Sequence, residues 1–530
     1  MRLARSFVWI LLPGGWTAHA ARAGDDVASL SIDVVEHRLE NGMTVLMVER
    51  HDTPTVATYL QFDVGGVDDP KGQTGIAHLL EHMMFKGTET FGTSDCEAEK
   101  PLMARLDRLW AEFDRERTKR HSPLEVADEA RIREIEEEIA QVSAGQKQHI
   151  IKNELWQAYQ RLGGTGLNAS TGEDSTQYYV QLPSNQLKVW AYLESDRLAH
   201  PVFREFYSER DVVHEERRLR TDTQPAGLFG EAFQGMAYVA HPYRNPVVGW
   251  PSDIDATVRE EVLEYFRTYY APNNCVAAIV GDIDPKVVIA LMEQTFGKIP
   301  GRSPPRRSIT KEPDHQGERR FTMRLESAPQ LRVGYPAPAA GHEDSFALSV
   351  ASRVLSGSAG FGGGGGGRRG GRGGGGGTGR LFKGLVLEQK IALNAGANVS
   401  FGRYPGLFNL SATPAPGVSL GDLEKALDQA LERFKSEPPT EEELARVRNA
   451  EDAAFVRRLR TNNGIAGAIA RAKTLAGDWR FLLRERDAIK AVTADDVVRV
   501  ANKYLVPEHR TVGFLESSER PSGEPREGRQ

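Results

Sequence analysis

Two histidines and a glutamate lie close together in the segment His78-Leu79-Leu80-Glu81-His82, and their spacing suits metal chemistry. Because each helical residue turns the chain by about 100°, His82 and Glu81 lie within about 60° of His78 on one face of a predicted helix. Such buried imidazoles need partners, and a zinc ion held by both would satisfy them while Glu81 takes a proton from water. The alternative is a surface helix with incidental histidines. It fits poorly, because the other residues of the segment are apolar, namely Ile76, Leu79, Leu80, Met83, Met84 and Phe85.

A catalytic zinc ion needs a third protein ligand. Glu209 and Glu216 are seven residues apart in a predicted helix, so they share one face to within about 20°. Glu215 points away from that face. One glutamate would bind the metal and the other would support a histidine ring from outside, and the spacing does not decide which is which. An exposed charged helix is the alternative, and it explains the neighbouring arginines but not the spacing.

The motif helix follows a run of predicted strands. Residues 31–64 contain strand-like alternation of side chains, with Asn41-Gly42 predicting a type I′ hairpin turn. The paired glycines Gly65-Gly66 end this run, and the motif helix begins near Gly75. Two further strands are predicted, at 176–182 and 275–280, with helices between them.

A region of different character occupies residues 97–155. Its apolar side chains recur at helical spacing on both sides of Ser122-Pro123-Leu124-Glu125, which reads as the capping box of a second helix. We therefore expect two antiparallel helices, inserted into the surrounding α/β pattern. Their outer faces are highly charged, and a solvated surface explains that charge better than a binding role.

A weak internal repeat indicates two similar halves. A capped helix, the sequence Tyr-x-x-Pro and a strand occur first at Tyr269 and again at Tyr504. The predicted fold class is therefore α+β, with two homologous half-domains that each pack helices on an antiparallel sheet. Chance similarity is the alternative.

The expected domain boundaries follow from this repeat and from composition. The first half should span 24–300 and carry the helical hairpin, and a linker rich in Pro and Arg at 301–316 should lead to the second half at 317–516. Residues 360–379 are mostly glycine, which favours a flexible surface loop because such a run cannot bury apolar surface. Residues 517–530 form a polar tail.

The N-terminus predicts export. Residues 1–23 combine a basic start, a short apolar core and small residues suited to cleavage after Ala20 or Ala23, so they resemble a secretory signal and point to a periplasmic location. No stretch is long enough to span a bilayer. The net charge of −6 argues against nucleic-acid binding, even though the glycine run contains scattered arginines. The two cysteines, Cys96 and Cys275, could be oxidised after export, but nothing shows that they meet.

Together these segments resemble the insulinase/pitrilysin-type zinc peptidases. The resemblance rests on the inverted H-x-x-E-H motif, on the downstream E-R-x-x-V-x-x-E that contains Glu209 and Glu216, and on shorter segments. It runs from about residue 31 to 515 and is nearest to the mitochondrial processing peptidase β subunit and its short bacterial relatives. The supporting segments are Phe85-Lys86-Gly87-Thr88, Gly163 to Thr171, His241-Pro242-Tyr243, Thr378 to Phe382 and Leu385 to Gln389.

The resemblance implies a set of site residues and a reaction. One zinc ion per chain would be held by His78, His82 and Glu216, which selects Glu216 as the ligand and leaves Glu209 as its outer support. The implied reaction is peptide hydrolysis, with Glu81 as the general base. The substrate contacts that it implies are Asn168 and Ala169. They lie on an edge strand, where an extended peptide would add its backbone to the sheet.

Two departures from the family pattern matter. The gap between His82 and Glu216 is enlarged, and the helical hairpin accounts for it. Members of the family also bind substrate with an Arg and a Tyr of the second half, and the aligned positions here are Leu385 and Ala392. We therefore expect a catalytic subunit that acts with a homologous partner carrying the Arg/Tyr pair, with a homodimer as an alternative. The competing hypothesis is a non-catalytic structural or chaperone-like subunit of the same fold.

Overall fold

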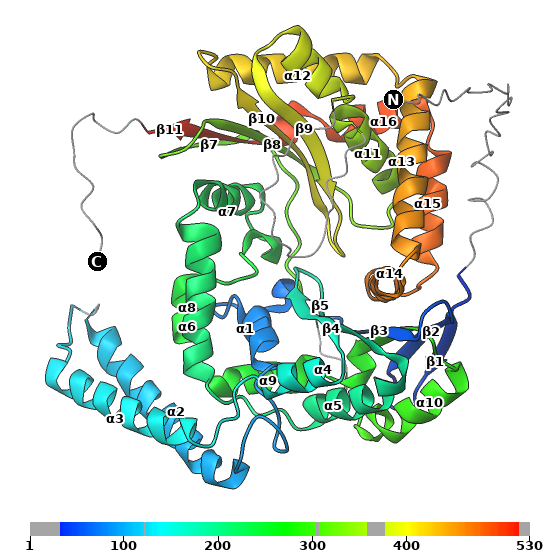
Figure 1. Cartoon of the computed structure of the whole chain (residues 1–530). Helices are drawn as coiled ribbons and strands as arrows, with labels where there is room; N and C mark the ends of the chain where they lie inside the picture. The colour runs from blue at the N-terminus through cyan, green and yellow to red at the C-terminus, as the bar shows by residue number, and fades with distance from the viewer. Residues whose placement is uncertain (1–31, 121–122, 304–306, 358–376, 519–530) are drawn as a thin grey trace, which may run out of the picture. The chain divides into compact units, whose positions relative to one another are not determined.

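The computed structural model describes residues 32–120, 123–303, 307–357 and 377–518. The predicted signal peptide and nearly all of the glycine-rich run and the polar tail lie outside these residues. Two β-sheets with helices packed on them form the part from Val34 onward (Figure 1). The predicted α+β fold class with two similar halves is confirmed. None of the helices in the described ranges is long and apolar enough to span a bilayer.

The first sheet has six strands in the order β1-β2-β6-β3-β5-β4. All neighbours are antiparallel except β2 and β6, and β4 forms one edge of the sheet. The strands are β1 (Val35–Arg38), β2 (Thr44–Glu49), β3 (Thr55–Phe62), β4 (Thr165–Thr171), β5 (Thr176–Pro183) and β6 (Cys275–Gly281). The helices of this half are α1 (Ile76–Met83), α2 (Cys96–Lys119), α3 (Glu129–Lys147), α4 (Glu154–Arg161), α5 (Leu187–Ala199), α6 (Phe206–Arg217), α7 (Pro225–Ala237), α8 (Pro251–Ala256), α9 (Arg259–Tyr269) and α10 (Pro285–Gln294).

The second sheet has five strands in the order β7-β11-β8-β10-β9, with one parallel pair, β7 and β11. The last strand of each half is thus inserted between the half's first two long strands, and the five-strand order matches β2-β6-β3-β5-β4. The strands are β7 (Arg319–Leu325), β8 (Gln330–Ala337), β9 (Ala392–Ser400), β10 (Gly406–Pro414) and β11 (Thr511–Ser517). The helices are α11 (Glu343–Ser356), α12 (Leu420–Ser436), α13 (Glu441–Leu459), α14 (Asn462–Ala476), α15 (Phe481–Ala491) and α16 (Ala494–Tyr504).

The repeated Tyr-x-x-Pro segments lie at equivalent places in the two halves. Each begins at the last residue of a helix, α9 or α16, and its proline opens a 3₁₀ turn, at Pro272–Asn274 and Pro507–His509. The chain then enters the inserted strand, β6 or β11. The short sequence repeat therefore marks the inserted strand of each sheet, which runs parallel to one of its two neighbours.

The predicted hairpin between β1 and β2 is present, but its turn is not of type I′. A type I′ turn needs positive φ at both central residues, whereas only Gly42 adopts it here, at +90°. Asn41 is held instead by long-range contacts, because its side-chain amide donates to the carbonyls of Phe296 and Ile299, each at 2.8 Å.

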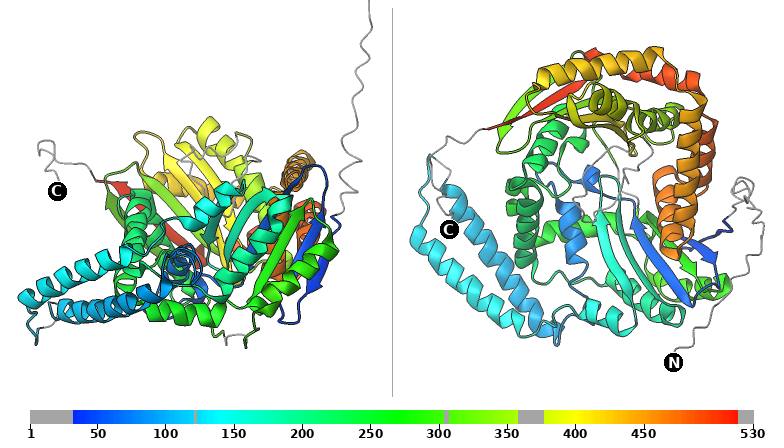
Figure 2. Two further views of the ribbon diagram at one scale, coloured as in Figure 1. Left: turned by 60° about the horizontal axis from the view of Figure 1, so that its bottom comes forward. Right: turned by 45° about the horizontal axis from the view of Figure 1, so that its top comes forward.

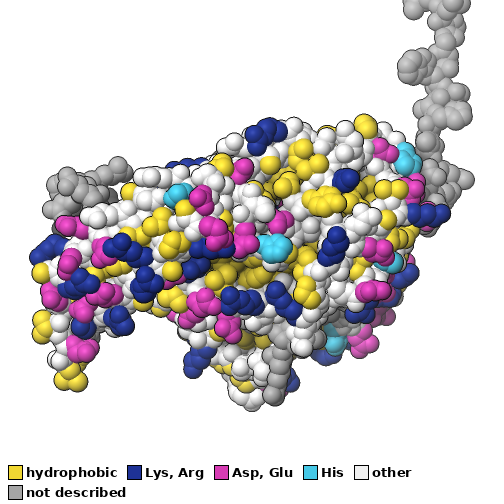
Figure 3. Space-filling model, turned by 90° about the horizontal axis from the view of Figure 1, so that it is seen from below, with side chains coloured by type: hydrophobic (Ala, Val, Ile, Leu, Met, Phe, Trp, Pro, Cys, Tyr) yellow, Lys and Arg dark blue, Asp and Glu magenta, His cyan; other side chains and the backbone are white. Residues whose placement is uncertain are grey.

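Helices α2 and α3 form the predicted hairpin, which projects from the rest of the first half (Figure 2). The second helix begins at Glu129 rather than after Ser122-Pro123. The cause is Asp128, whose carboxylate accepts hydrogen bonds from the amides of Ala130 and Arg131, each at 3.0 Å. Basic and acidic side chains are interspersed along the hairpin, at the left of Figure 3, as expected for a solvated surface.

The base of the hairpin is anchored by a buried ion pair. Glu99 is fully buried and lies 3.1 Å from Nε of Arg204, and Gln146 of α3 donates to the same carboxylate at 3.0 Å. The Arg204 guanidinium also donates to the carbonyl of Thr88 at 2.7 Å. Thr88 lies five residues after the end of α1. The base of the hairpin is therefore hydrogen-bonded to the segment that follows the motif helix.

Each half contributes a helix that packs against the sheet of the other half. Helix α14 of the second half packs against β3 and β6 of the first sheet, and α7 of the first half packs against β7 and β11 of the second. Phe229 and Phe233 of α7 meet Phe321 of β7, with ring centroids 5.7 and 6.4 Å apart. Each sheet is thus covered in part by a helix of the other half, which joins the two halves through apolar contacts.

Candidate functional site

Helix α1 carries the H-x-x-E-H motif, and its N-terminus is held by close backbone packing. Gly75 has a φ of +89°, and a Cβ atom at Gly249 would lie 2.3 Å from the carbonyl oxygen of Thr74. The carboxylate of Asp69 accepts from the amides of Gly75 and Ala77 at 2.7 and 3.2 Å, which satisfies the first free donors of the helix. The apolar residues of α1 are buried as predicted.

The structure brings the predicted ligands together from two helices. Nε2 of His78 lies 3.7 Å from one carboxylate oxygen of Glu216, and Nε2 of His82 lies 3.3 Å from the other. One nitrogen or oxygen from each of the three residues falls within 4.8 Å of the others. Ligands about 2.0–2.1 Å from a tetrahedral zinc ion are about 3.4 Å apart, so this set fits zinc after a small adjustment.

Glu209 lies behind the same cluster, as an outer support would. Its carboxylate is 3.4 Å from Nδ1 of His82, the ring nitrogen that points away from Glu216. Nζ of Lys86 lies 2.5 Å from the other oxygen of Glu209 and 3.4 Å from Glu205. The sequence predicts Lys86 only as part of a supporting segment, and Glu205 is not among the predicted site residues. Each is nevertheless four residues from a predicted site residue, His82 or Glu209, and this spacing is the local signal that could have found it.

The charges of the cluster are strongly perturbed. Burial and, to a smaller extent, the nearby His82 lower the pKa of His78 to about 4. Burial would also lower the pKa of His82, but its hydrogen bonds with Glu209 and Glu216 raise that pKa to about 9. Burial opposes ionisation of Glu216, whereas the hydrogen bond with His82 and the charges of His78 and Arg220 bring its pKa to about 2. An imidazolium is thus held between two carboxylates, and a bound metal ion would displace its proton.

Glu81 faces the edge strand of the first sheet. The hydroxyl of Thr171, the last residue of β4, donates to the Glu81 carboxylate at 2.6 Å. Burial raises the pKa of Glu81, and the hydrogen bond from Thr171 lowers it. The contact fixes the orientation of one carboxylate oxygen, so that the other remains available for chemistry.

Arg220 is a second residue that sequence reasoning missed. It lies in a π-helical turn, Arg218–Asp222, that continues directly from α6. Its guanidinium contacts the oxygen of Glu216 that faces His78, while 70% of the side chain remains exposed. The spacing of four residues from Glu216 is the one signal that the sequence offers. Arg220 places a permanent positive charge with free donors beside the proposed metal ligands.

A cavity of about 620 Å³ opens over the cluster. The predicted substrate contacts Asn168 and Ala169 line it, Asn168 with an exposed side chain and Ala169 buried. Strand β4 pairs with β5 on one side only, so its other backbone edge faces away from the sheet. An apolar wall that includes Phe85, Ile151 and Trp156 lies within the same cavity.

Residues that line this cavity come from the first half alone among the described positions. Leu385 and Ala392, at the positions of the family's Arg/Tyr pair, are buried at 0% and 4% exposure in the core of the second half. The two cysteines are both free, with Cys275 buried.

Comparisons with known proteins agree with this architecture. The profile described as insulinase (peptidase family M16) matches residues 44–118, and that of the peptidase M16 inactive domain matches 257–451. Zinc protease PqqE of Helicobacter pylori is 26% identical over 486 residues, 90% of this chain and 91% of that protein. The mitochondrial-processing peptidase subunit beta of Lentinula edodes is 22% identical over 479 residues, 88% of this chain and 86% of that protein.

A crystal structure of a protease from Helicobacter pylori has the same fold. It matches with a TM-score of 0.72 at 24% identity, covering 92% of this chain and 100% of that chain. Two profiles of one family, relatives that match nearly the whole length and a shared fold lead to one assignment: the chain belongs to the insulinase family of peptidases, family M16.

Proposed function

We propose that the chain is a zinc-dependent endopeptidase that hydrolyses unfolded peptides or small proteins. The observation that carries the proposal is the convergence of His78, His82 and Glu216 beside Glu81 in an open cavity. Two imidazoles and one carboxylate form a ligand set typical of catalytic zinc, with a position left for substrate. When bound, zinc would act as a Lewis acid that polarises the scissile carbonyl.

The surrounding residues support this reaction. An extended peptide would add to the free edge of β4 and pass Asn168 and Ala169 on its way over the cluster. Glu81, oriented by Thr171, would take a proton from the attacking water and deliver it to the leaving amine. Glu209 would hold the ring of His82 in the tautomer that presents Nε2 to the metal.

The cavity also supports a role for a partner subunit. Its described lining contains no residue of the second half, and the buried Leu385 and Ala392 cannot bind a substrate carbonyl. We infer that a homologous subunit supplies an Arg/Tyr pair, so that the active species is a heterodimer, with a homodimer as the alternative. The signal-like N-terminus supports export, and a periplasmic location is proposed on that basis.

A metal analysis combined with a peptidase assay tests the proposal. The purified mature chain is expected to contain one equivalent of zinc and to cleave an unfolded peptide faster when the homologous subunit is added. The assay should be run on the chain alone, on the partner alone and on the mixture. Zinc binding without cleavage in any arm would support the non-catalytic alternative, and full activity of the chain alone would contradict the partner requirement.

Replacing Glu209 should weaken the metal site without destroying it. Glu209→Gln removes the negative charge that faces Nδ1 of His82, and losses of such outer partners weaken metal binding by about 10–100-fold. Zinc affinity can be measured by competition with a chromophoric chelator. Glu215→Gln is the matched control, since Glu215 lies on the same helix but is exposed and pairs with Arg218. Equal affinity in both variants would remove Glu209 from the site.

A further inference from the structure

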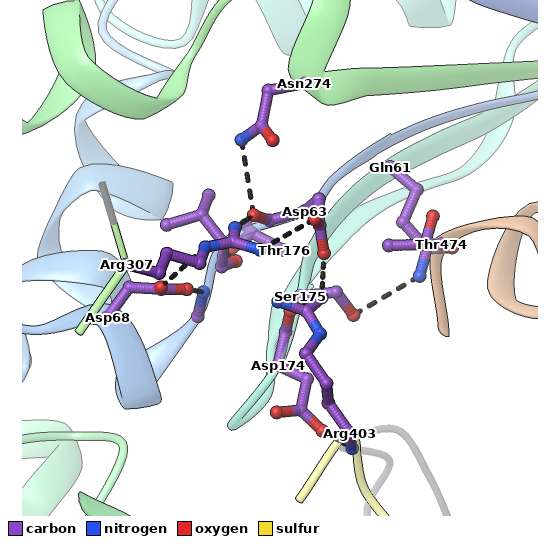
Figure 4. Close-up of polar contacts among 12 residues, drawn as sticks. Gln61, Asp63, Asp68, Asp174, Ser175, Thr176, Asn274, Arg307, Arg403 and Thr474 are labelled. Atoms are coloured by element: carbon purple, nitrogen blue, oxygen red, sulfur yellow. Dashed lines mark hydrogen bonds and ion pairs between the residues drawn. The ribbon is translucent and has the colours of Figure 1, made fainter. Parts of the chain in front are cut away.

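A turn of the second half contacts the end of the edge strand of the first half. The chain between β9 and β10 brings Arg403 to Asp174, which lies in the turn between β4 and β5 (Figure 4). The backbone amide of Arg403 donates to the Asp174 carboxylate at 2.8 Å, and its guanidinium donates to the Asp174 carbonyl at 3.3 Å. The hydroxyl of Tyr243 donates to the same carboxylate at 2.7 and 2.8 Å. Asp174 is therefore held from two sides.

The approach of the two turns is very close. A Cβ atom at Gly402 would lie 2.2 Å from the hydroxyl oxygen of Tyr243 and 2.6 Å from the carboxylate of Asp174. Its φ is not in the left-handed region, so the position requires glycine for space rather than for backbone conformation. Tyr243 and Tyr404 belong to an apolar cluster formed by residues of both halves, so the polar contacts are next to a packed apolar core.

A second arginine extends this network into the linker. The guanidinium of Arg403 forms an ion pair with Asp63, and Nη1 of Arg307 lies 2.8 Å from the other oxygen of Asp63. Nε of Arg307 lies 3.0 Å from the buried Asp68 (Figure 4). One arginine from the second half and one from the linker thus neutralise carboxylates of the first half, which would otherwise be costly to bury together.

The clamped turn lies directly beside the contact that orients the proposed base. Only two residues lie between Thr171, which donates to Glu81, and Asp174. The same turn bonds to the segment before α1, since the amides of Gly66 and Val67 donate to the carbonyls of Gly172 and Glu173 at 3.0 and 2.9 Å. A shift of the turn would therefore move both the end of β4 and its hydroxyl partner for Glu81.

We propose that Arg403 is a positioning residue through which the second half holds the β4–β5 turn and, with it, the Thr171–Glu81 contact. Strand β4 ends at Thr171 and forms an open edge of the sheet, so its end depends on the turn for its position. The second half then contributes to the reaction without placing a side chain in the described cavity lining. The catalytic part of this inference rests on the proposed peptidase function, whereas the structural part does not.

The test compares Arg403→Met with Arg320→Met in the full chain. Arg320 also forms an ion pair with a largely buried carboxylate, Glu424, but both partners lie within the second half. In Arg403→Met we expect amide hydrogen exchange across residues 168–175 to become at least about 10-fold faster. We expect kcat to fall about 10–100-fold, as for a misplaced catalytic group, with zinc affinity unchanged. Arg320→Met should change neither quantity.

A milder variant, Arg403→Lys, keeps the test decisive if Arg403→Met folds poorly. Arg403→Lys retains the charge but replaces the planar guanidinium, whose Nη2 contacts both Asp63 and the Asp174 carbonyl, with a flexible amine, so its kcat and exchange rates should lie between those of wild type and Arg403→Met. If amide hydrogen exchange across residues 168–175 were unchanged in both Arg403 variants, the proposal that Arg403 holds the β4–β5 turn would be overturned. Faster exchange with an unchanged kcat would overturn the catalytic role alone. A wild-type chain that stays inactive after the homologous subunit is added would count against the proposed function, while the exchange measurement would still show whether Arg403 holds the turn.

Discussion

Glu81→Gln is expected to reduce peptide hydrolysis by at least about 100-fold while leaving the metal content unchanged, because general-base catalysis contributes about 10²–10⁴-fold. The substitution keeps the size of the side chain and its ability to accept the hydrogen bond from Thr171. It removes only the capacity to take a proton. Glu81 is not among the three residues whose ligand atoms converge, so zinc binding should persist.

Activity and metal content should be measured on the same preparation. The assay needs the homologous subunit present in excess, so that loss of turnover reflects chemistry rather than assembly. Glu89→Gln is a suitable control, because Glu89 follows the same helix but is half exposed and pairs with Lys100. Retained turnover in Glu81→Gln would remove Glu81 from its role as base, and loss of zinc would indicate that Glu81 is a ligand instead.

The local part of this site was predictable from the sequence. Helical spacing places His78, Glu81 and His82 on one face, and the run of apolar neighbours predicts the burial of α1. The seven-residue spacing likewise predicts that Glu209 and Glu216 face the same way, and both do face the histidines. Periodicity alone left the ligand undecided, and the family resemblance selected Glu216. In the structure Glu216 approaches both Nε2 atoms and Glu209 approaches only Nδ1 of His82, so Glu216 stays the predicted ligand.

The contacts between distant segments could not be predicted in this way. Lys86 meets Glu205 and Glu209 only because the segment after α1 crosses the start of α6. Arg403 meets Asp174 only because two turns more than 200 residues apart come together. These contacts join segments that are far apart in the sequence, so no local spacing indicates which residues become partners.

Two fold details show the same limit at smaller scale. Asn41-Gly42 has the composition of a type I′ turn, but tertiary hydrogen bonds from Asn41 select another geometry. Ser122 to Glu125 has the composition of a helix start, but Asp128 caps the helix instead. At Asn41 a local preference of the order of 1 kcal/mol is outweighed by hydrogen bonds available only in the folded chain, whereas Asp128 is a second local cap that competes with Ser122 for the start of the helix.

Glu216→Gln should abolish stable zinc binding and, with it, turnover. An amide oxygen is a much weaker zinc ligand than a carboxylate, and the remaining pair of histidines leaves the site without its third protein ligand. The loss should exceed the 10–100-fold weakening expected when an outer partner such as Glu209 is removed. The expected order of zinc affinity is therefore wild type, then Glu209→Gln, then Glu216→Gln.

Thermal unfolding provides a measurement that does not depend on activity. Zinc that binds only the folded protein raises Tm in proportion to the logarithm of its concentration, so wild type should show a zinc-dependent Tm and Glu216→Gln should not. Glu215→Gln should respond like wild type, because that side chain is 60% exposed and contacts Arg218 rather than a histidine. If Glu216→Gln kept its zinc-dependent Tm while Glu209→Gln lost it, the two glutamates would exchange roles. Glu209 would then be the ligand, and the His82 ring would have to flip when metal binds.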